Sequence, residues 1–307
     1  MTAADRFVTV HCDGRTGSDA ATFNFITTRA VVYTSDELDT ANSGNVGIGT
    51  GAGVYPVVYG TRQYAMSFEN LAPVTMNGAG GTLVVDASSN TSVSTLEIRD
   101  TGAAADTYSI VDGNGTFEDV TFEGYGTLVV RSGPGSDLID LVSLDTSAPP
   151  TAVTLDGDNA TDTDTSADTL RVRSTPASTV SVTLLGGAGS DTYNLFDTAP
   201  TVDNILGPVF ISSAPPAPPG DEGGSDFLLV DDSADPTGDM VTVTDTTIDG
   251  ITGYAGGTDI TMFFNVEPPA PPPPNDCVQI NSGTGDDTID AFAATGTVYD
   301  LIIDAGP

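Results

Sequence analysis

The stretch Ser181-Val-Thr-Leu-Leu-Gly-Gly-Ala-Gly-Ser-Asp-Thr-Tyr-Asn-Leu195 decides how the chain folds. Its first five residues alternate apolar and polar side chains, with Val182 and Leu184 on one face. Three glycines in four residues then interrupt the alternation, and a second alternating segment follows Asp191. Apolar alternation is typical of a half-buried strand, and glycine–aspartate clusters mark turns. The stretch therefore predicts a strand, a sharp turn and another strand.

The same turn recurs along the chain. Two further copies are strict: Gly133-Pro-Gly135-Ser-Asp137 and Gly283-Thr-Gly285-Asp-Asp287, each with an alternating segment on both sides. Weaker copies place equivalent positions at 19, 53, 82, 106, 168, 226 and 259. The mean spacing is then about 30 residues, which is typical of repeat proteins whose units stack along one axis.

One unit indicates what each repeat contains. After Asp106, three alternating segments cover Tyr108–Val111, Phe117–Phe122 and Leu128–Val130, separated by glycine-rich turns. Three short strands in a unit of this length suit one coil of a parallel β-helix. We therefore predict an all-β fold, with residues 1–307 forming a single parallel β-helix (solenoid) of about ten coils. One or two β-sandwich domains are the alternative, since they also combine short strands with frequent turns.

Two proline-rich segments interrupt the repeat, near 214–224 and near 267–275. Proline lacks the N–H that a sheet ladder needs and favours extended, isolated backbone. The repeat resumes after each segment. We therefore expect both to be loops inserted into the solenoid, without dividing it into domains.

The charge of the chain excludes two classes of partner. Forty-three Asp and Glu face eight basic residues, all of them Arg, which gives a formal net charge of −35. Nucleic acid and anionic membrane surfaces attract clustered Lys and Arg, so neither is an expected partner. No apolar run approaches the roughly 20 residues that span a membrane. Carboxylates at this density repel one another, and divalent cations or salt would relieve the repulsion.

The strict turns resemble the Gly-Gly-x-Gly-x-Asp nonapeptide of the repeats-in-toxin calcium-binding family, which the segment 186–194 matches at every specified position. In that family, aspartates and turn carbonyls hold Ca²⁺ between neighbouring turns. Family repeats are contiguous, whereas this motif recurs about every 30 residues, so the turn chemistry transfers and the β-roll does not. The resemblance implies Ca²⁺ as a cofactor. The expected ligands are Asp137, Asp168, Asp191, Asp226, Asp259, Asp286 and Asp287.

A purely structural role for these aspartates remains open. Glycine adopts the positive φ that sharp corners need, and a corner aspartate can accept backbone N–H groups in an Asx-turn. Stacking of the corners would instead bring carboxylates to roughly 4.8 Å from one another, a spacing that favours a bridging cation. The sequence supports both interpretations.

Enzymatic function is not expected. The only histidine, His11, lies between Val10 and Cys12, and no nucleophile elbow, zinc-protease motif or phosphate-binding loop occurs. Parallel β-helices include polysaccharide lyases and hydrolases, so a carbohydrate-active enzyme is the alternative. Carboxylates are plentiful enough for the close pair that a hydrolase needs. The base of a lyase would be Lys, which is absent, or an Arg; the candidates are Arg99, Arg131, Arg171 and Arg173, which could instead be ion-paired.

The sequence as a whole favours a structural or adhesive repeat protein. Its Gly-, Asp- and Thr-rich texture resembles segments of very large bacterial surface and matrix proteins, which implies an extracellular or cell-surface location without a visible signal peptide. No polar cap is evident at either end, so we expect end-to-end self-association or continuation in a longer chain, with carbohydrate as a further partner. Cys12 and Cys277 are far apart in sequence and indicate no disulfide framework.

Overall fold

The chain forms an all-β structure. In the computed structural model, every regular element among the described residues is a strand, and no helix occurs among them. This confirms the predicted all-β class. The described residues are 8–13, 19–24, 30–35, 44–49, 64–69, 71–87, 93–102, 107–113, 119–157, 165–212, 224–263, 276–292 and 299–306.

The strands build two sheets. The larger sheet has 13 strands. In spatial order they are β1 (Val8–Asp13), β5 (Tyr64–Glu69), β4 (Gly44–Gly49), β3 (Ala30–Ser35), β7 (Thr82–Asp86), β11 (Thr127–Arg131), β13 (Ala152–Asp156), β15 (Ser181–Leu185), β17 (Val209–Ser212), β21 (Ile260–Phe263), β20 (Thr247–Asp249), β19 (Met240–Thr244) and β23 (Thr288–Phe292).

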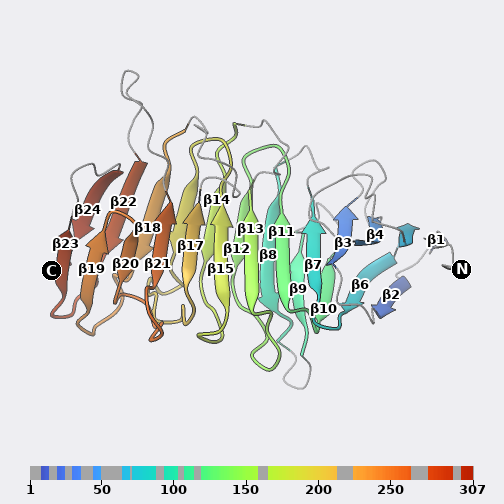
Figure 1. Ribbon diagram of the computed structural model, residues 1–307, viewed down its shortest axis with the longest axis horizontal. Helices are drawn as coiled ribbons and strands as arrows, with labels where there is room; N and C mark the ends of the chain where they lie inside the picture. The colour runs from blue at the N-terminus through green and yellow to red at the C-terminus, as the bar shows by residue number, and fades with distance from the viewer. Residues whose placement is uncertain are drawn as a thin grey trace, which may run out of the picture.

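The smaller sheet has 11 strands and runs alongside the larger one, so that the molecule is elongated, with β1 and β24 toward opposite ends (Figure 1). In spatial order its strands are β2 (Asp19–Asn24), β6 (Leu71–Asn77), β10 (Val120–Glu123), β9 (Ser109–Asp112), β8 (Thr95–Asp100), β12 (Leu138–Leu141), β14 (Thr169–Val172), β16 (Thr192–Leu195), β18 (Phe227–Asp231), β22 (Asp276–Asn281) and β24 (Tyr299–Asp304).

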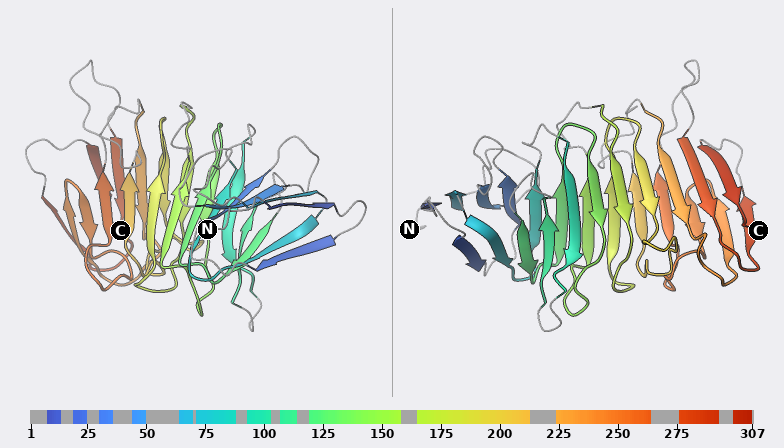
Figure 2. Two further views of the ribbon diagram at one scale, coloured as in Figure 1. Left: turned by 45° about the vertical axis from the view of Figure 1, so that its right-hand side comes forward. Right: turned by 180° about the vertical axis from the view of Figure 1, so that it is seen from behind.

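The chain passes back and forth between the two sheets. From β11 to β18 each strand belongs to the opposite sheet from the one before it. Each strand from β11 to β16 pairs in parallel with the strand two places later. We call one passage through a strand of each sheet a circuit. Successive circuits lie side by side along the long axis, as both views in Figure 2 show. Two mostly parallel sheets linked in this way form a β-helix-like arrangement.

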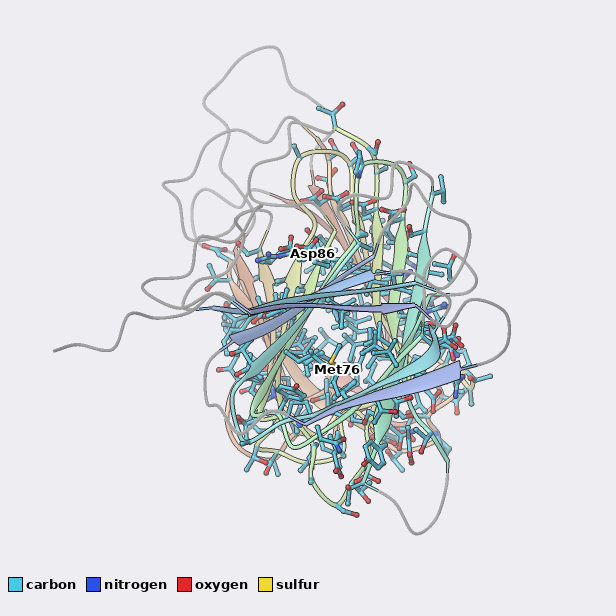
Figure 3. The ribbon with its side chains drawn as sticks, turned by 90° about the vertical axis from the view of Figure 1, so that its right-hand side faces the viewer. Met76 and Asp86 are labelled. Atoms are coloured by element: carbon cyan, nitrogen blue, oxygen red, sulfur yellow. The ribbon has the colours of Figure 1, made fainter. Side chains whose placement is uncertain are left out.

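The core lies between the sheets. Because side chains alternate along a strand, the register of parallel pairing stacks apolar residues into columns. One column of the smaller sheet runs Leu96–Ile139–Leu170–Tyr193–Leu228–Val278, and a column of the larger sheet runs Leu83–Leu128–Val153–Val182–Val209–Ile260, with every member buried. Figure 3, an end-on view, shows side chains filling the space between the sheets around Met76, whereas Asp86 lies on the outer face of the larger sheet.

Three meanders break the regular winding. In β3–β4–β5, β8–β9–β10 and β19–β20–β21, the middle strand is antiparallel to both neighbours in the same sheet. Each meander runs backward: β8 pairs with the later strand β12, while β10 pairs with the earlier strand β6. Tight hairpins allow such antiparallel neighbours, which a uniform coil lacks.

The meanders correct the predicted three-strand coil. Of the three segments predicted after Asp106, the first two correspond to β9 and β10, which are antiparallel neighbours in the smaller sheet, and only the third, β11, lies in the larger sheet. Local alternation shows where strands occur but does not distinguish a hairpin from a corner. A regular circuit in this structure has two strands instead of three.

The proline-rich insertions leave the pairing register intact. Their central residues lie outside the described part of the chain. After the first, β18 pairs with β16, and after the second, β22 pairs with β18, each in continuous parallel register. The strands thus resume the stack after each interruption. Because the described residues contain no helix, none of them forms a helix that could cross a membrane.

Candidate functional site

Four of the predicted aspartates stack at one corner of the fold. Asp137, Asp168, Asp191 and Asp226 each immediately precede a strand of the smaller sheet, where the chain arrives from the larger sheet. All four are buried. This confirms that these four positions of the sequence repeat are structurally equivalent.

Backbone amides of neighbouring circuits hold the four carboxylates, and we call this arrangement the aspartate ladder. The Asp137 N–H donates to Oδ1 of Asp168 at 2.8 Å, and the Asp168 N–H donates to Oδ1 of Asp191 at 2.8 Å. The Asp191 N–H donates to Oδ1 of Asp226 at 2.9 Å, and the Ser94 N–H donates to Oδ1 of Asp137 at 2.5 Å. Each carboxylate therefore bridges two circuits.

The ladder explains why the repeat requires aspartate. At the corner the backbone leaves the sheet, so the N–H that precedes each strand has no carbonyl partner in the next circuit. A short side-chain acceptor satisfies that buried donor, which would otherwise be costly. The carboxylates thus bond between circuits, and Gly133 N–H also donates locally to Oδ2 of Asp137 at 3.2 Å, as the expected turn requires. Ca²⁺ binding at these four positions stays a prediction.

Asp259 lies elsewhere, before β21 of the larger sheet. Its Oδ2 accepts three consecutive backbone N–H groups, from Gly250, Ile251 and Thr252, each at 2.9 Å. The carboxyl is almost completely buried, and burial raises its pKa, an effect that these bonds counteract and the Asp249 charge reinforces. Asp259 thus holds a turn closed and is not part of the ladder.

We expect the charge of Asp259 to reduce stability at neutral and alkaline pH. A pKa raised by folding means that the folded state binds this proton more tightly than the unfolded state does, so stability is gained at low pH and lost as pH rises through the folded value. Asp259→Asn keeps an accepting oxygen without the charge. Thermal melts from pH 4, just above the usual pKa of 3.8, to pH 8 at constant ionic strength should show a flatter decline for Asp259→Asn than for the unmodified chain.

Asp290→Asn provides the control for that experiment, because Asp290 is exposed on β23. This substitution also removes one negative charge, but an exposed charge instead of a buried one. If Asp290→Asn flattened the decline as much as Asp259→Asn, general repulsion among surface carboxylates would explain the pH dependence, and burial of Asp259 would not.

The third strict motif occupies the opposite corner. Asp287 lies between β22 of the smaller sheet and β23 of the larger sheet, so the chain crosses there in the other direction. Asp287 Oδ1 accepts the Asp239 N–H at 2.9 Å, which joins the 282–287 loop to the 232–239 loop. Asp286, predicted as a ligand, is exposed. Identical local motifs therefore serve two different corners.

An acidic cluster that the glycine–aspartate motif does not mark lies at this corner. One carboxylate oxygen from each of Asp232, Asp235 and Asp239 lies within 4.8 Å of the others. Asp232 is completely buried, Asp235 nearly so, and Asp239 half-buried. The segment Asp232-Ser-Ala-Asp235-Pro-Thr-Gly-Asp239 concentrates three aspartates in eight residues, a signal that a search for Gly-x-Gly-x-Asp does not detect.

The three carboxylates differ in their hydrogen bonding. Asp235 accepts the Thr237 N–H at 3.1 Å and the Thr237 hydroxyl at 2.5 Å, which fixes its orientation. Asp232 Oδ1 accepts the Val202 N–H at 2.9 Å. Oδ2 of Asp232 and Oδ2 of Asp239 are buried and accept no hydrogen bond of normal geometry from the described residues, although the Thr201 hydroxyl lies close enough to Asp232 to oppose the rise of its pKa.

Burial perturbs the acidity of this cluster. It raises the pKa of Asp232 to about 7, with Asp235 and Asp239 raising it further and the Val202 N–H opposing the shift. Burial likewise raises the pKa of Asp239, with the charges of Asp235, Asp287 and Asp203 adding to it. Crowded, buried carboxyls of this kind favour a bound cation or a retained proton.

The arginines considered as catalytic bases are all ion-paired. Arg131 Nε donates to Asp156 Oδ2 at 3.0 Å in a buried pair, and Arg99 pairs with Glu97 and Asp112 at 3.1 Å. Arg171 and Arg173 both bind Asp140, at 2.7 and 2.5 Å. The pairs of Arg131, Arg171 and Arg173 join neighbouring circuits, whereas Arg99 pairs within β8 and with the antiparallel neighbour β9. All four guanidinium groups thus contact carboxylates of the fold.

Comparison with known proteins identifies no relative: no family model, no curated protein and no solved structure matches this chain. The case for its function therefore rests on its own residues and their geometry.

Proposed function

We propose that this protein is a structural or adhesive repeat protein of the cell surface or extracellular space, folded as a parallel β-helix and forming part of a fibre, surface layer or large surface protein. The observation that carries the proposal is the continuity of the stack. Parallel pairing and apolar columns extend through successive circuits, and the aspartate ladder repeats the same corner across four of them. An elongated body held by repeated local contacts suits a load-bearing spacer.

The solenoid interpretation draws support from the spacing of equivalent residues. The ladder aspartates follow one another at intervals of 31, 23 and 35 residues, close to the predicted repeat. The three backward meanders make the winding irregular, so we propose a β-helix with inserted hairpins. The high negative charge favours solubility of such a body and makes it repel nucleic acid and anionic lipid.

We further propose that the end of the stack formed by β23 and β24 pairs with β-structure of another chain. These strands are the outermost members of their sheets. Phe292 on β23 and Ile302 and Ile303 on β24 are exposed, and so is Met240 on the adjacent β19. An exposed strand edge with apolar side chains is a template for pairing with a further strand.

Self-association tests this proposal. Sedimentation velocity of the full chain at rising concentration should show a shift toward larger species. Ile303→Glu should suppress the shift, because a buried, unpaired carboxylate is costly at the contact. Val93 is exposed but lies before β8, away from this end, so Val93→Glu is the matched control and should leave the shift unchanged.

Two results would count against this assembly. The first is a strictly monomeric full chain at the highest concentration. The second is equal suppression by Val93→Glu and Ile303→Glu, which would indicate charge repulsion between molecules instead of a defined contact.

A further inference from the structure

The C-terminal part of the chain contributes no basic residue to balance its carboxylates. Residues 174–307 contain 20 Asp and Glu and no Lys, Arg or His. The loops that meet at the acidic cluster all belong to this part: Val202 and Asp203 come from one loop, 232–239 from the second and 282–287 from the third. The three loops therefore bring no positive charge of their own to this corner, and a cation from solution can supply it.

The cluster and the neighbouring Asp287 also contain buried acceptors without donors. Oδ2 of Asp232, a completely buried residue, accepts no hydrogen bond of normal geometry from the described residues, and the same holds for Oδ2 of Asp239 and of Asp287. Buried carboxylate oxygens are normally hydrogen-bonded or coordinated. Three such oxygens at one corner indicate that a positively charged ligand, coordinated by oxygen atoms, binds there.

We propose that Asp232, Asp235 and Asp239 bind one divalent cation, Ca²⁺, at the corner between the smaller and the larger sheet. All the ligating atoms are carboxylate oxygens, which favour a hard cation over zinc or copper. Ca²⁺ accepts six to eight oxygens in flexible geometry, whereas Mg²⁺ needs near-ideal octahedral coordination and keeps more of its water. Three carboxylates supplied by one eight-residue loop therefore suit Ca²⁺ better than Mg²⁺. The proposal does not depend on the scaffold role.

The cation would connect neighbouring circuits. Asp239 donates its N–H to Asp287, and Asp232 accepts from Val202, so the cluster already touches the loops on both sides. The Asp232 N–H in turn donates to the carbonyl of Asn281 at 2.8 Å. Neutralising the cluster would stabilise all three loops together and stiffen this part of the stack.

Calorimetric titration of the chelator-treated full chain with CaCl₂, at pH 7.5 and 150 mM NaCl, tests the site. We expect saturable binding that loses one site per chain in Asp239→Asn. Asp300→Asn removes an exposed carboxylate from β24 and should keep that site. Titration with MgCl₂ should give weaker binding than CaCl₂.

Melting temperature gives a second readout that distinguishes binding from misfolding. With EDTA present, Asp239→Asn should melt at the same temperature as the unmodified chain or higher, because one of several repelling charges is gone. Ca²⁺ should raise the melting temperature of the unmodified chain, beyond the effect of NaCl at equal ionic strength, and this specific rise should be lost in Asp239→Asn.

The proposal is overturned by either of two results. One is the absence of saturable Ca²⁺ binding in the unmodified chain. The other is binding whose stoichiometry and melting-temperature gain are the same in Asp239→Asn as in Asp300→Asn. In both cases the buried carboxyls would hold a proton instead of a cation.

Discussion

Replacing Gly207 by alanine is expected to destabilise the fold by about 3 kcal/mol or more. A Cβ at this buried position would lie 1.9 Å from the carbonyl oxygen of Val180 and 3.1 Å from that of Ala177. Both obstacles are backbone atoms, so no side-chain rotation can relieve the overlap. The Gly207 N–H also donates to the Thr175 hydroxyl at 2.8 Å, and this bond holds the backbone at Gly207 against the segment that contains Thr175. Urea unfolding followed by circular dichroism measures the loss.

Gly80→Ala provides the comparison. Gly80 has a φ of 84°, but an added Cβ would meet nothing within 4 Å. Only the unfavourable backbone conformation then contributes, about 1–2 kcal/mol. If Gly80→Ala proved as destabilising as Gly207→Ala, close packing of neighbouring loops would not be the reason for glycine at position 207.

Replacing Leu170 by alanine is expected to cost about 2–5 kcal/mol. Leu170 is completely buried and lies between Ile139 and Tyr193 in the apolar column of the smaller sheet. The neighbours above and below are held by the parallel ladder, so they cannot close the cavity that the substitution leaves. The same unfolding measurement applies, with the shift in the urea midpoint as the readout.

Leu229→Ala is the matched control for the column. Leu229 is on β18, on the face directed away from the core, and is only half-buried. The same change of side chain there removes less buried apolar surface and leaves no enclosed cavity, so a much smaller shift is expected. Equal shifts at both positions would contradict the assignment of the core to the space between the sheets.

Most of the secondary structure could be predicted from local sequence. Alternation placed strands at β11, β15, β16 and β22, because one face of each strand packs on the core and the other does not. The repeated aspartates at 137, 168, 191 and 226 marked one true corner, since the same unpaired amide recurs in each circuit and needs the same acceptor.

The winding of the chain could not be predicted in this way. A glycine-rich turn reverses the chain whether it leads to a hairpin or to the other sheet, so the meander β8–β9–β10 was mistaken for part of a regular coil. The strict motif at Asp287 was assigned to the same corner as Asp191, although it faces the opposite one. The local sequence pattern is the same in both settings, and only the pairing of distant strands distinguishes them.

The sequence by itself determined the all-β class, the approximate repeat, the excess of negative charge and the residues able to make sharp corners. Tertiary structure alone decided which corners stack, and therefore which carboxylates meet. Asp239 contacts Asp287 across 48 residues, and Gly207 must be glycine because a loop near Val180 lies against it. Strand formation depends on neighbours one or two residues away, whereas each of these contacts depends on how many residues the chain uses to complete a circuit.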